Sequence, residues 1–385
     1  MFGKRIRVFK LFNFQVHIDI SWIFIALLVT WSLAAGYFPS RYHGFSNSSY
    51  WWMGIFGAFG FFFSIIFHEL MHSLVARRFG LPIRGITLFV FGGVAEMEEE
   101  PTSAKTEFFM AISGPLSSIL LGFIFYLLYR LSYLYSTSYP VMAVLEYLGW
   151  INWILAGFNL VPAFPLDGGR ILRSILWRWK KDLRWATLIS AHIGSGFGIF
   201  LSLLGIFYFF MGAFVAGLWY FLIGMFLRGA AQMSYQRLLI MRALKGESIK
   251  DFMQERPITV PADISIQSLV DDYIYKYHHK LFPVVENGKL LGCITTQEVK
   301  AIPREKWPEY KVAKVLRSCS AGNTITPDTE AAKALSMMNK THKSRMMVVK
   351  EGELLGIITL KDLLKFISLK MELEAGEFKP DDLVS

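Results

Sequence analysis

The chain has 385 residues, 54% of them hydrophobic and 16% aromatic, with a formal net charge of +10 and two cysteines. This apolar load is too high for an ordinary soluble enzyme and is typical of a membrane protein. The basic residues gather at the ends of apolar runs, with no basic stripe of interleaved aromatics, which argues against a nucleic-acid partner. Cys293 and Cys319 predict neither a disulfide framework nor a cysteine metal site, which suits a reducing cytoplasm.

Long apolar runs, each of about 20 residues or more, predict six transmembrane helices. They cover residues 20–38, 50–76, 108–131, 141–164, 186–209 and 212–233. The last two are so close together that they predict either a tight helical hairpin or a different division into spans. The first run lacks a small-residue cleavage site after it, so we expect a retained span instead of a removed signal.

Lys and Arg residues indicate the orientation of these spans. They cluster before the first span, after the second and after the fourth, whereas the opposite loops hold little beyond Arg41. By the positive-inside rule, both termini and the whole C-terminal part are expected to face the cytoplasm. The sequence therefore predicts a multi-pass plasma-membrane protein embedded in the lipid bilayer.

Residues 81–101, between the second and third spans, are too polar to cross a bilayer. Residues 85–93 predict a short strand that ends in a glycine turn, and the acidic run Glu96, Glu98, Glu99 and Glu100 follows it. The acidic run is expected to be a solvated loop. The strand is expected to present an exposed edge that could pair with an extended peptide.

The second span contains the motif His68-Glu69-Leu70-Met71-His72. Histidines at positions i and i+4 lie on one face of a helix, so both imidazoles can reach one ion. The adjacent Glu69 carboxylate can take a proton from water activated by zinc. One histidine in a span could be an ordinary packed residue, but a glutamate beside it in an apolar helix is costly and indicates function. His192, which has no partner at helical spacing, is instead expected to be structural or cavity-lining.

A hydrolytic zinc site usually has three protein ligands and one open position. The fourth span ends in a segment that runs from Asn159 through Pro162 and Pro165 to Asp167, followed by two glycines. The prolines and the glycine pair are expected to break the helix, and irregular backbone at that depth is tolerated where it lines a cavity. Asp167 is therefore predicted as the third ligand. The simpler interpretation is a helix stop with a capping aspartate.

These motifs resemble the site-2 protease family. That family pairs HExxH in one span with Asn-x-x-Pro-x-x-Pro-x-Asp-Gly in a later one, and Ser113-Gly114-Pro115 and Gly92-Gly93 also match its pattern. The roles that the resemblance implies are one zinc ion held by His68, His72 and Asp167, Glu69 as general base, and Asn159 near the scissile peptide. The implied substrate is a transmembrane protein extended along residues 85–93, because a helix hides its peptide carbonyls in its own hydrogen bonds.

The C-terminal part contains an internal repeat. Residues 282–295 recur as residues 346–359, each copy preceded by a proline-bearing segment and followed by a helix. Two copies about 60 residues apart predict a tandem pair of small α/β units. They resemble tandem cystathionine-β-synthase-type (CBS) domains, which pair into a disc with clefts for adenine nucleotides.

The CBS resemblance implies ATP or AMP as a regulator, bound through Thr295, Glu298, Thr359 and Asp362. An equally adequate interpretation is that each threonine caps a helix and each acid stabilises its first turn. The resemblance is also compatible with a homodimer through the CBS domains.

The expected architecture is a polytopic α-helical membrane protein, with a short β element between spans two and three, followed by a soluble α/β CBS pair. The expected boundaries are a protease domain over 1–235, a linker over 236–249, CBS domains over 250–305 and 306–375, and a tail over 376–385. The expected function is that of an intramembrane zinc metalloprotease gated by nucleotide through the linker. A CBS-regulated channel or transporter is the alternative from another class, and a proteolytically inactive scaffold is a third, but neither requires a zinc-hydrolase residue set.

Overall fold

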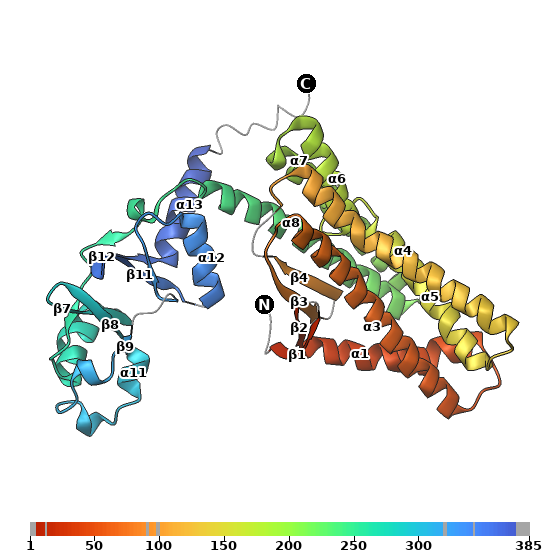
Figure 1. Cartoon of the computed structure of the whole chain (residues 1–385), viewed down its shortest axis with the longest axis horizontal. Coiled ribbons are helices and arrows are strands. Elements are labelled where there is room, and N and C mark those ends of the chain that lie inside the picture. Colours follow the sequence, from red (N-terminus) through yellow and green to blue (C-terminus); the bar gives the residue numbers. More distant parts are fainter. Residues whose placement is uncertain are drawn as a thin grey trace. The chain divides into compact units, whose positions relative to one another are not determined.

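The computed structural model of the chain describes residues 5–11, 14–89, 92–97, 101–318, 322–341 and 343–374. They form two compact units whose boundary falls between Gln236 and Arg237 (Figure 1). The N-terminal unit contains the apolar runs, and the C-terminal unit contains the repeat.

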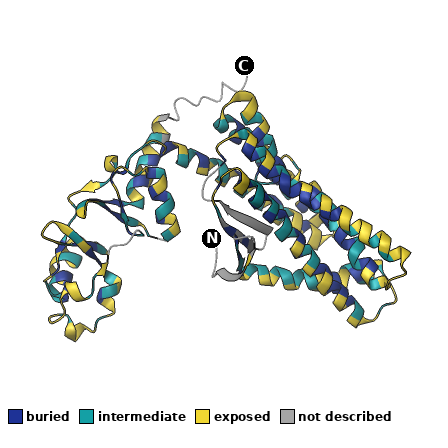
Figure 2. Cartoon of the chain, in the orientation of Figure 1, coloured by how far each residue is buried: buried dark blue, intermediate teal, exposed yellow. Residues whose placement is uncertain are grey.

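Six helices in the described part of the chain are long and apolar enough to cross a membrane. The first is built from α1 (Ile20–Ser32), the π-helical turn η1 (Leu33–Tyr37) and α2 (Phe38–Arg41). The others are α3 (Asn47–Arg78), α4 (Ala104–Leu134), α5 (Tyr139–Asn159), α7 (Leu183–Phe210) and α8 (Phe214–Ala243). Large apolar side chains such as Phe59, Leu127 and Phe200 are exposed. Figure 2 shows exposed and intermediate residues along the long helices of this unit. The predicted set of six spans is confirmed.

Polar caps fix where several of these helices begin. The Ser46 hydroxyl accepts a hydrogen bond from Ser49 N at the start of α3, and Ser103 accepts one from Thr106 N at the start of α4. The Asp182 carboxylate accepts hydrogen bonds from Arg184 N and Trp185 N at the start of α7. Each cap satisfies a backbone N–H that has no partner inside the helix.

The fourth span is shorter than predicted, because α5 ends at Asn159 and residues 160–166 are not helical. The glycine pair was predicted to break a helix, but it lies in the first turn of α6 (Asp167–Lys180). A Cβ on Gly168 would lie 2.3 Å from Leu160 O, and one on Gly169 would lie 2.3 Å from Phe164 N. The glycines therefore allow α6 to pack directly against the preceding loop. The sequence analysis had identified this region only as a loop rich in Lys and Arg after the fourth span.

Helices α7 and α8 form the expected tight hairpin, which turns at Gly212 with φ +86°. Their backbones approach closely at glycines: a Cβ on Gly198 would lie 2.6 Å from Gly224 O, and one on Gly205 would lie 2.6 Å from Gly217 O. Small residues that let helix backbones touch are a common packing solution in membranes. Helix α8 continues to Ala243, so much of the predicted linker is helical.

The N-terminal unit also contains a four-stranded sheet, ordered β1-β2-β3-β4. Its strands are β1 (Arg5–Leu11), β2 (Phe14–Asp19), β3 (Ile83–Phe89) and β4 (Gly92–Met97). Strand β3 pairs in parallel with β2 and antiparallel with β4. The close approach of β2 requires a glycine at position 85, where a Cβ would lie 2.3 Å from Gln15 O.

This pairing corrects the expectation for residues 85–93. They form no single edge strand, because β3 has a neighbour on each side and, of these residues, those of β4 lie in an edge strand. The prediction missed β1 and β2. Strand β2 pairs with β3 on the side away from β4, and β1 pairs with β2. The two glycines predicted to form the turn, Gly92 and Gly93, are instead the first residues of β4, and residues 90 and 91 of the predicted strand lie outside the described residues. The same is true of Glu98, Glu99 and Glu100 in the acidic run.

The C-terminal unit is built from two similar halves whose strands share one sheet, ordered β10-β11-β12-β8-β7-β6. The first half contains β6 (Val260–Pro261), α9 (Ile266–Ser268), η3 (Leu269–Ile274), α10 (Tyr275–Tyr277), β7 (Leu281–Glu286), β8 (Lys289–Thr295) and α11 (Thr296–Lys300). The second contains β10 (Thr324–Ile325), α12 (Ala331–Thr341), β11 (Arg345–Lys350), β12 (Glu353–Thr359) and α13 (Leu360–Glu374). The short elements η2 (Ile249–Asp251), β5 (Gln254–Glu255), η4 (Arg304–Lys306), η5 (Val312–Lys314) and β9 (Arg317–Ser318) complete the unit.

Each half has its own apolar core. The core of the first half includes Phe282 and Ile294, and that of the second includes Val348 and Ile358. The second core also includes Leu244, which follows the last residue of α8 and is fully buried. Helix α8 is therefore continuous from its apolar span to the core of the second half.

Candidate metal centre

His68 and His72 lie one turn apart on α3, and both are almost completely buried. Their Nε2 atoms are 3.2 Å apart. The other ring nitrogen of each histidine has a partner on α4: Nδ1 of His72 lies 2.6 Å from Met110 O, and Nδ1 of His68 lies 2.8 Å from Ser118 Oγ. Because a backbone carbonyl can only accept, Nδ1 of His72 carries the proton and Nε2 presents its lone pair.

Asp167 completes the group from the first turn of α6. Its Oδ2 lies 3.0 Å from His68 Nε2 and 3.1 Å from His72 Nε2. Ligands bound tetrahedrally at about 2.0–2.1 Å from zinc are about 3.3 Å apart, so these three atoms have nearly the spacing of a zinc ligand set. Within the described residues, this is the one group of three metal-ligating side chains with convergent atoms.

The chemistry of the three atoms also fits a cation. Two neutral imidazoles and a carboxylate would direct three electron pairs toward one buried point, an arrangement that a positive ion stabilises. Both imidazoles are oriented from outside by α4, as is usual for metal-bound histidines. The predicted approach of Asp167 to the two histidines is therefore seen in the structure. Its assignment as a zinc ligand stays a prediction.

Gly114 on α4 provides the space for the cluster. A Cβ at this position would lie 2.2 Å from His72 Nε2 and 2.5 Å from His68 Nε2. Any side chain here would have to displace both imidazoles. The sequence showed Ser113-Gly114-Pro115 only as part of a family pattern, and the reason for the glycine became visible with the packing of α4 against α3.

A buried ion pair holds α6 against α4. Glu107 is fully buried in the first turn of α4, and Arg173 on α6 is 4% exposed. Arg173 donates from Nε to Glu107 Oε1 at 2.6 Å, and its Nη2 also contacts that oxygen. The Arg173 guanidinium also lies over the Phe164 ring, 5.1 Å from its centroid. The pair connects the helix that orients the histidines with the helix that carries Asp167, and our sequence analysis did not single it out.

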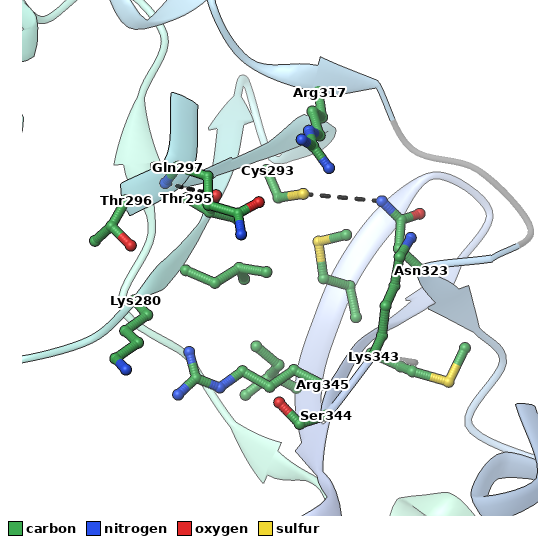
Figure 3. A pocket seen from close by; sticks show the side chains of 14 residues that line it. Lys280, Cys293, Thr295, Thr296, Gln297, Arg317, Asn323, Lys343, Ser344 and Arg345 are labelled. Carbon is green, nitrogen blue, oxygen red and sulfur yellow. Dashed lines mark hydrogen bonds between the residues drawn. The ribbon is translucent and has the colours of Figure 1, made fainter. Parts of the chain in front are cut away.

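A second cluster of polar residues lines a cavity of about 340 Å³ between the two halves of the C-terminal unit (Figure 3). Thr295, one of the four predicted nucleotide contacts, lines this cavity, whereas Glu298, Thr359 and Asp362 are not among its lining residues. Apolar side chains from both halves, among them Leu281 and Met347, form part of its wall.

The capping interpretation of these four residues has direct support. Thr295 N donates to Glu298 Oε2 at 2.9 Å, and Gln297 N donates to Thr295 Oγ1 at 3.2 Å. In the second half, Thr359 N donates to Asp362 Oδ2 at 3.0 Å, and the Thr359 hydroxyl accepts from Asp362 N at 3.2 Å. Both threonines therefore begin helices with the acid three residues later, a capping box.

Comparison with known proteins agrees with both units. A sequence profile of peptidase family M50 matches residues 56–137 and 135–204, and a CBS domain profile matches residues 249–303 and 323–369. A zinc metalloprotease of Methanocaldococcus jannaschii is 31% identical over 365 residues, which cover 94% of this chain and 96% of that protein. The chain belongs to peptidase family M50.

Two further relatives of this M50 chain cover less of it. A solved site-2 protease structure from Methanocaldococcus jannaschii is 30% identical and covers 60% of this chain and 94% of that one, with a TM-score of 0.42. Stage IV sporulation protein FB of Bacillus subtilis is 33% identical over 109 residues, which are 28% of this chain and 36% of that protein. The M50 chain is thus a site-2-type zinc metalloprotease with tandem CBS domains and a multi-pass membrane part.

The remaining predicted residues of the M50 chain do not belong to the cluster. Glu69 is partly exposed and follows His68 directly on α3. Asn159 donates from Nδ2 to Leu155 O at 3.0 Å inside its own helix. His192 is exposed on α7 and is not part of the cluster. The roles of Glu69 and Asn159 stay predictions, and the interpretation of His192 as a packed structural residue has no support from its burial.

Proposed function

We propose that this M50 chain hydrolyses a peptide bond within or near a transmembrane segment of a substrate protein. The observation that carries the proposal is the convergence of His68, His72 and Asp167 on one point inside the span-forming unit, with ligand atoms 3.0–3.2 Å apart. One zinc ion held there would supply Lewis acidity and make hydroxide available near neutral pH. A proteolytic site among the membrane-spanning helices would act on chains that lie in the membrane.

Each residue of the site contributes a distinct step. Met110 O and Ser118 Oγ hold the imidazoles through Nδ1, with their Nε2 atoms toward Asp167; these atoms and the Asp167 carboxylate would hold the ion. The Glu69 carboxylate accepts the proton of the attacking water and later gives it to the leaving amine. Asn159, at the end of α5, would hydrogen-bond the substrate backbone once the substrate helix has opened.

The substrate must be extended at the scissile bond, since a helical peptide keeps its carbonyls in internal hydrogen bonds. Strand β4 supports this step: within the described residues it pairs only with β3, so its other edge can accept an added strand. We therefore place the substrate along β4, at the Gly92-Gly93 end of the segment predicted for it.

Replacing Glu69 with glutamine tests the general-base role. The variant is expected to keep about one zinc per chain, because none of the three ligand atoms changes. Its rate of cleavage of a transmembrane substrate is expected to fall by about 100-fold or more. Zinc by elemental analysis and cleavage in detergent or liposomes are the two measurements. Full cleavage by Glu69→Gln would exclude this base, and cleavage unaffected by loss of zinc would exclude the metalloprotease mechanism for this chain.

The same proposal places the chain in the plasma membrane with both termini and the CBS pair in the cytoplasm. The basic residues of α6 and of the α6–α7 connection support this orientation, because they follow directly on the fourth span. A homodimer formed through the CBS domains stays a prediction.

We also propose that an adenine nucleotide, ATP or AMP, in the CBS pair regulates cleavage. Two observations favour it: the cavity between the halves, and helix α8, which is continuous across the boundary of the two units. A change in the second half can therefore bias the position of the sixth span, because Leu244 just beyond α8 is fixed in that core.

Breaking the helix at the boundary tests this coupling. Gln236 and Arg237 are both exposed, so replacing them with glycine removes no buried contact and weakens the helix by about 1 kcal/mol per residue. ATP is expected to change the cleavage rate of the wild-type chain and of the matched Gln236→Ala/Arg237→Ala variant, but not that of the glycine pair. An equal response in all three chains would show that α8 does not carry the signal.

A further inference from the structure

The cavity in the C-terminal unit is strongly cationic. Its lining includes four basic residues and no acidic one, the basic residues being Lys280, Arg317, Lys343 and Arg345. Figure 3 shows the Arg345 guanidinium and the Lys280 side chain turned toward each other across one side of the cavity. Like charges that face each other repel, so this arrangement favours an anion between them.

Among the described residues, one of the four cations has a carboxylate partner. Arg317 Nε lies 2.5 Å from Glu298 Oε1, and Glu298 is also bonded to Thr295. Lys280, Lys343 and Arg345 form no ion pair in the part of the chain that the structure describes. Three positive charges are therefore free to meet a ligand.

The two halves of the unit supply these cations from the same kind of position. In the first half, Thr296 N donates to Lys280 O at 3.1 Å, and in the second half Leu360 N donates to Ser344 O at 2.9 Å. Lys280 thus lies just before β7, and Lys343 and Arg345 lie just before and at the start of β11. The backbone therefore brings all three cationic residues to the places where β7 and β11 begin, and we call these residues the cationic rim.

Another part of the cavity lining is apolar and neutral. It contains Leu281, Met346, Met347 and Ile357 beside the buried Cys293. Burial raises the pKa of the Cys293 thiol, so it stays protonated near neutral pH and adds no negative charge. An apolar wall of this kind suits the flat face of a nucleobase, with polar groups at the rim fixing its charged end.

We propose that this cavity selects a nucleoside triphosphate over a monophosphate, through Lys280, Lys343 and Arg345. A terminal phosphate carries about two negative charges at pH 7, so a monophosphate would leave one of the three cations unbalanced. Each further phosphoryl group adds about one charge, so a triphosphate matches or exceeds the cationic rim. This selection rests on the proposed nucleotide regulation and specifies its ligand.

Calorimetric titration of the full-length chain in detergent, with ATP, AMP and inorganic tripolyphosphate, tests the selection. ATP is expected to bind at least about tenfold more tightly than AMP, and more weakly as salt is raised. The Lys343→Gln/Arg345→Gln variant should lose about tenfold or more in ATP affinity while its AMP affinity falls by less than about threefold. Lys361→Gln, an exposed lysine outside the cavity, is the matched control and should bind ATP like the wild type.

Three results would overturn the inference: AMP binding as tightly as ATP, an ATP affinity that the double variant keeps, or an equal loss in the Lys361→Gln control. Tripolyphosphate that binds as tightly as ATP would refute the role of the apolar wall. Because binding is measured without cleavage, these outcomes are separate from the proposed proteolysis. A chain that prefers ATP but cleaves at an unchanged rate would refute the regulation and leave the selection intact.

Discussion

Asp167→Ala is expected to remove zinc from the purified chain. The change takes away the one negatively charged atom of the cluster and leaves two imidazoles, which do not complete a protein zinc site. Loss of groups that merely orient ligands already costs about 10–100-fold in metal affinity, so loss of a ligand should cost more. Zinc per chain, measured after dialysis against a weak chelator, should fall from about one to near zero, and His72→Ala should behave alike.

The matched control is Asp182→Ala, which removes a carboxylate just after α6 that caps α7 and does not belong to the cluster. It should cost about 1 kcal/mol of stability at most and keep its zinc. A full zinc complement in Asp167→Ala, or equal zinc loss in Asp182→Ala, would contradict the three-ligand site.

Glu107→Gln is expected to destabilise the membrane unit and loosen the metal centre together. The change leaves the Arg173 guanidinium buried without its carboxylate, and breaking a buried ion pair in this way costs about 3–5 kcal/mol. Because the pair fixes α6 against α4, Asp167 should then sit less firmly between the histidines. Thermal unfolding in detergent and zinc affinity, both measured on the same preparation, should fall.

The double variant Glu107→Leu/Arg173→Met separates these two effects. Replacing both charges with apolar groups of similar size removes the buried pair. Arg170, whose Nε lies 4.0 Å from Glu107 Oε1, loses a partner too, but its side chain is 18% exposed and can reach solvent, so much of the lost stability should return. Glu146→Gln is the control: its partner Arg41 is exposed, and the glutamine can still accept the hydrogen bond from the Tyr42 hydroxyl, so the unfolding temperature should change little. A Glu107→Gln chain as stable as Glu146→Gln would show that the buried pair is not what holds α6.

The local chemistry could be read from the sequence because it depends on short spacing. Residues four apart, such as His68 and His72, lie on the same face of any helix. Asp167 could be identified because it follows a proline-bearing segment and precedes two glycines. The tandem repeat was visible because both copies keep the same strand pattern. The six spans followed from the length of each apolar run, since the bilayer sets the required length.

Features that depend on contacts between distant segments could not be read in the same way. Strands β1 and β2 reach β3 from far along the chain, and their pairing converted a predicted edge strand into an interior one. The start of helix α6 was not predicted because its first turn contains the glycine pair, and glycine usually ends helices. The packing of this turn against residues 160–164 explains why glycine is needed there.

The sequence by itself determined the class of this protein: a membrane metalloprotease with HExxH and Asp167, followed by a CBS pair. Only the tertiary structure decided how these residues meet. The three ligand atoms converge because α4 orients the imidazoles, Gly114 leaves them room, and the Glu107–Arg173 pair fixes the helix that carries Asp167. The same holds for the cationic cavity, since Lys280 and Arg345 belong to different halves of the repeat and only their packing brings the charges together.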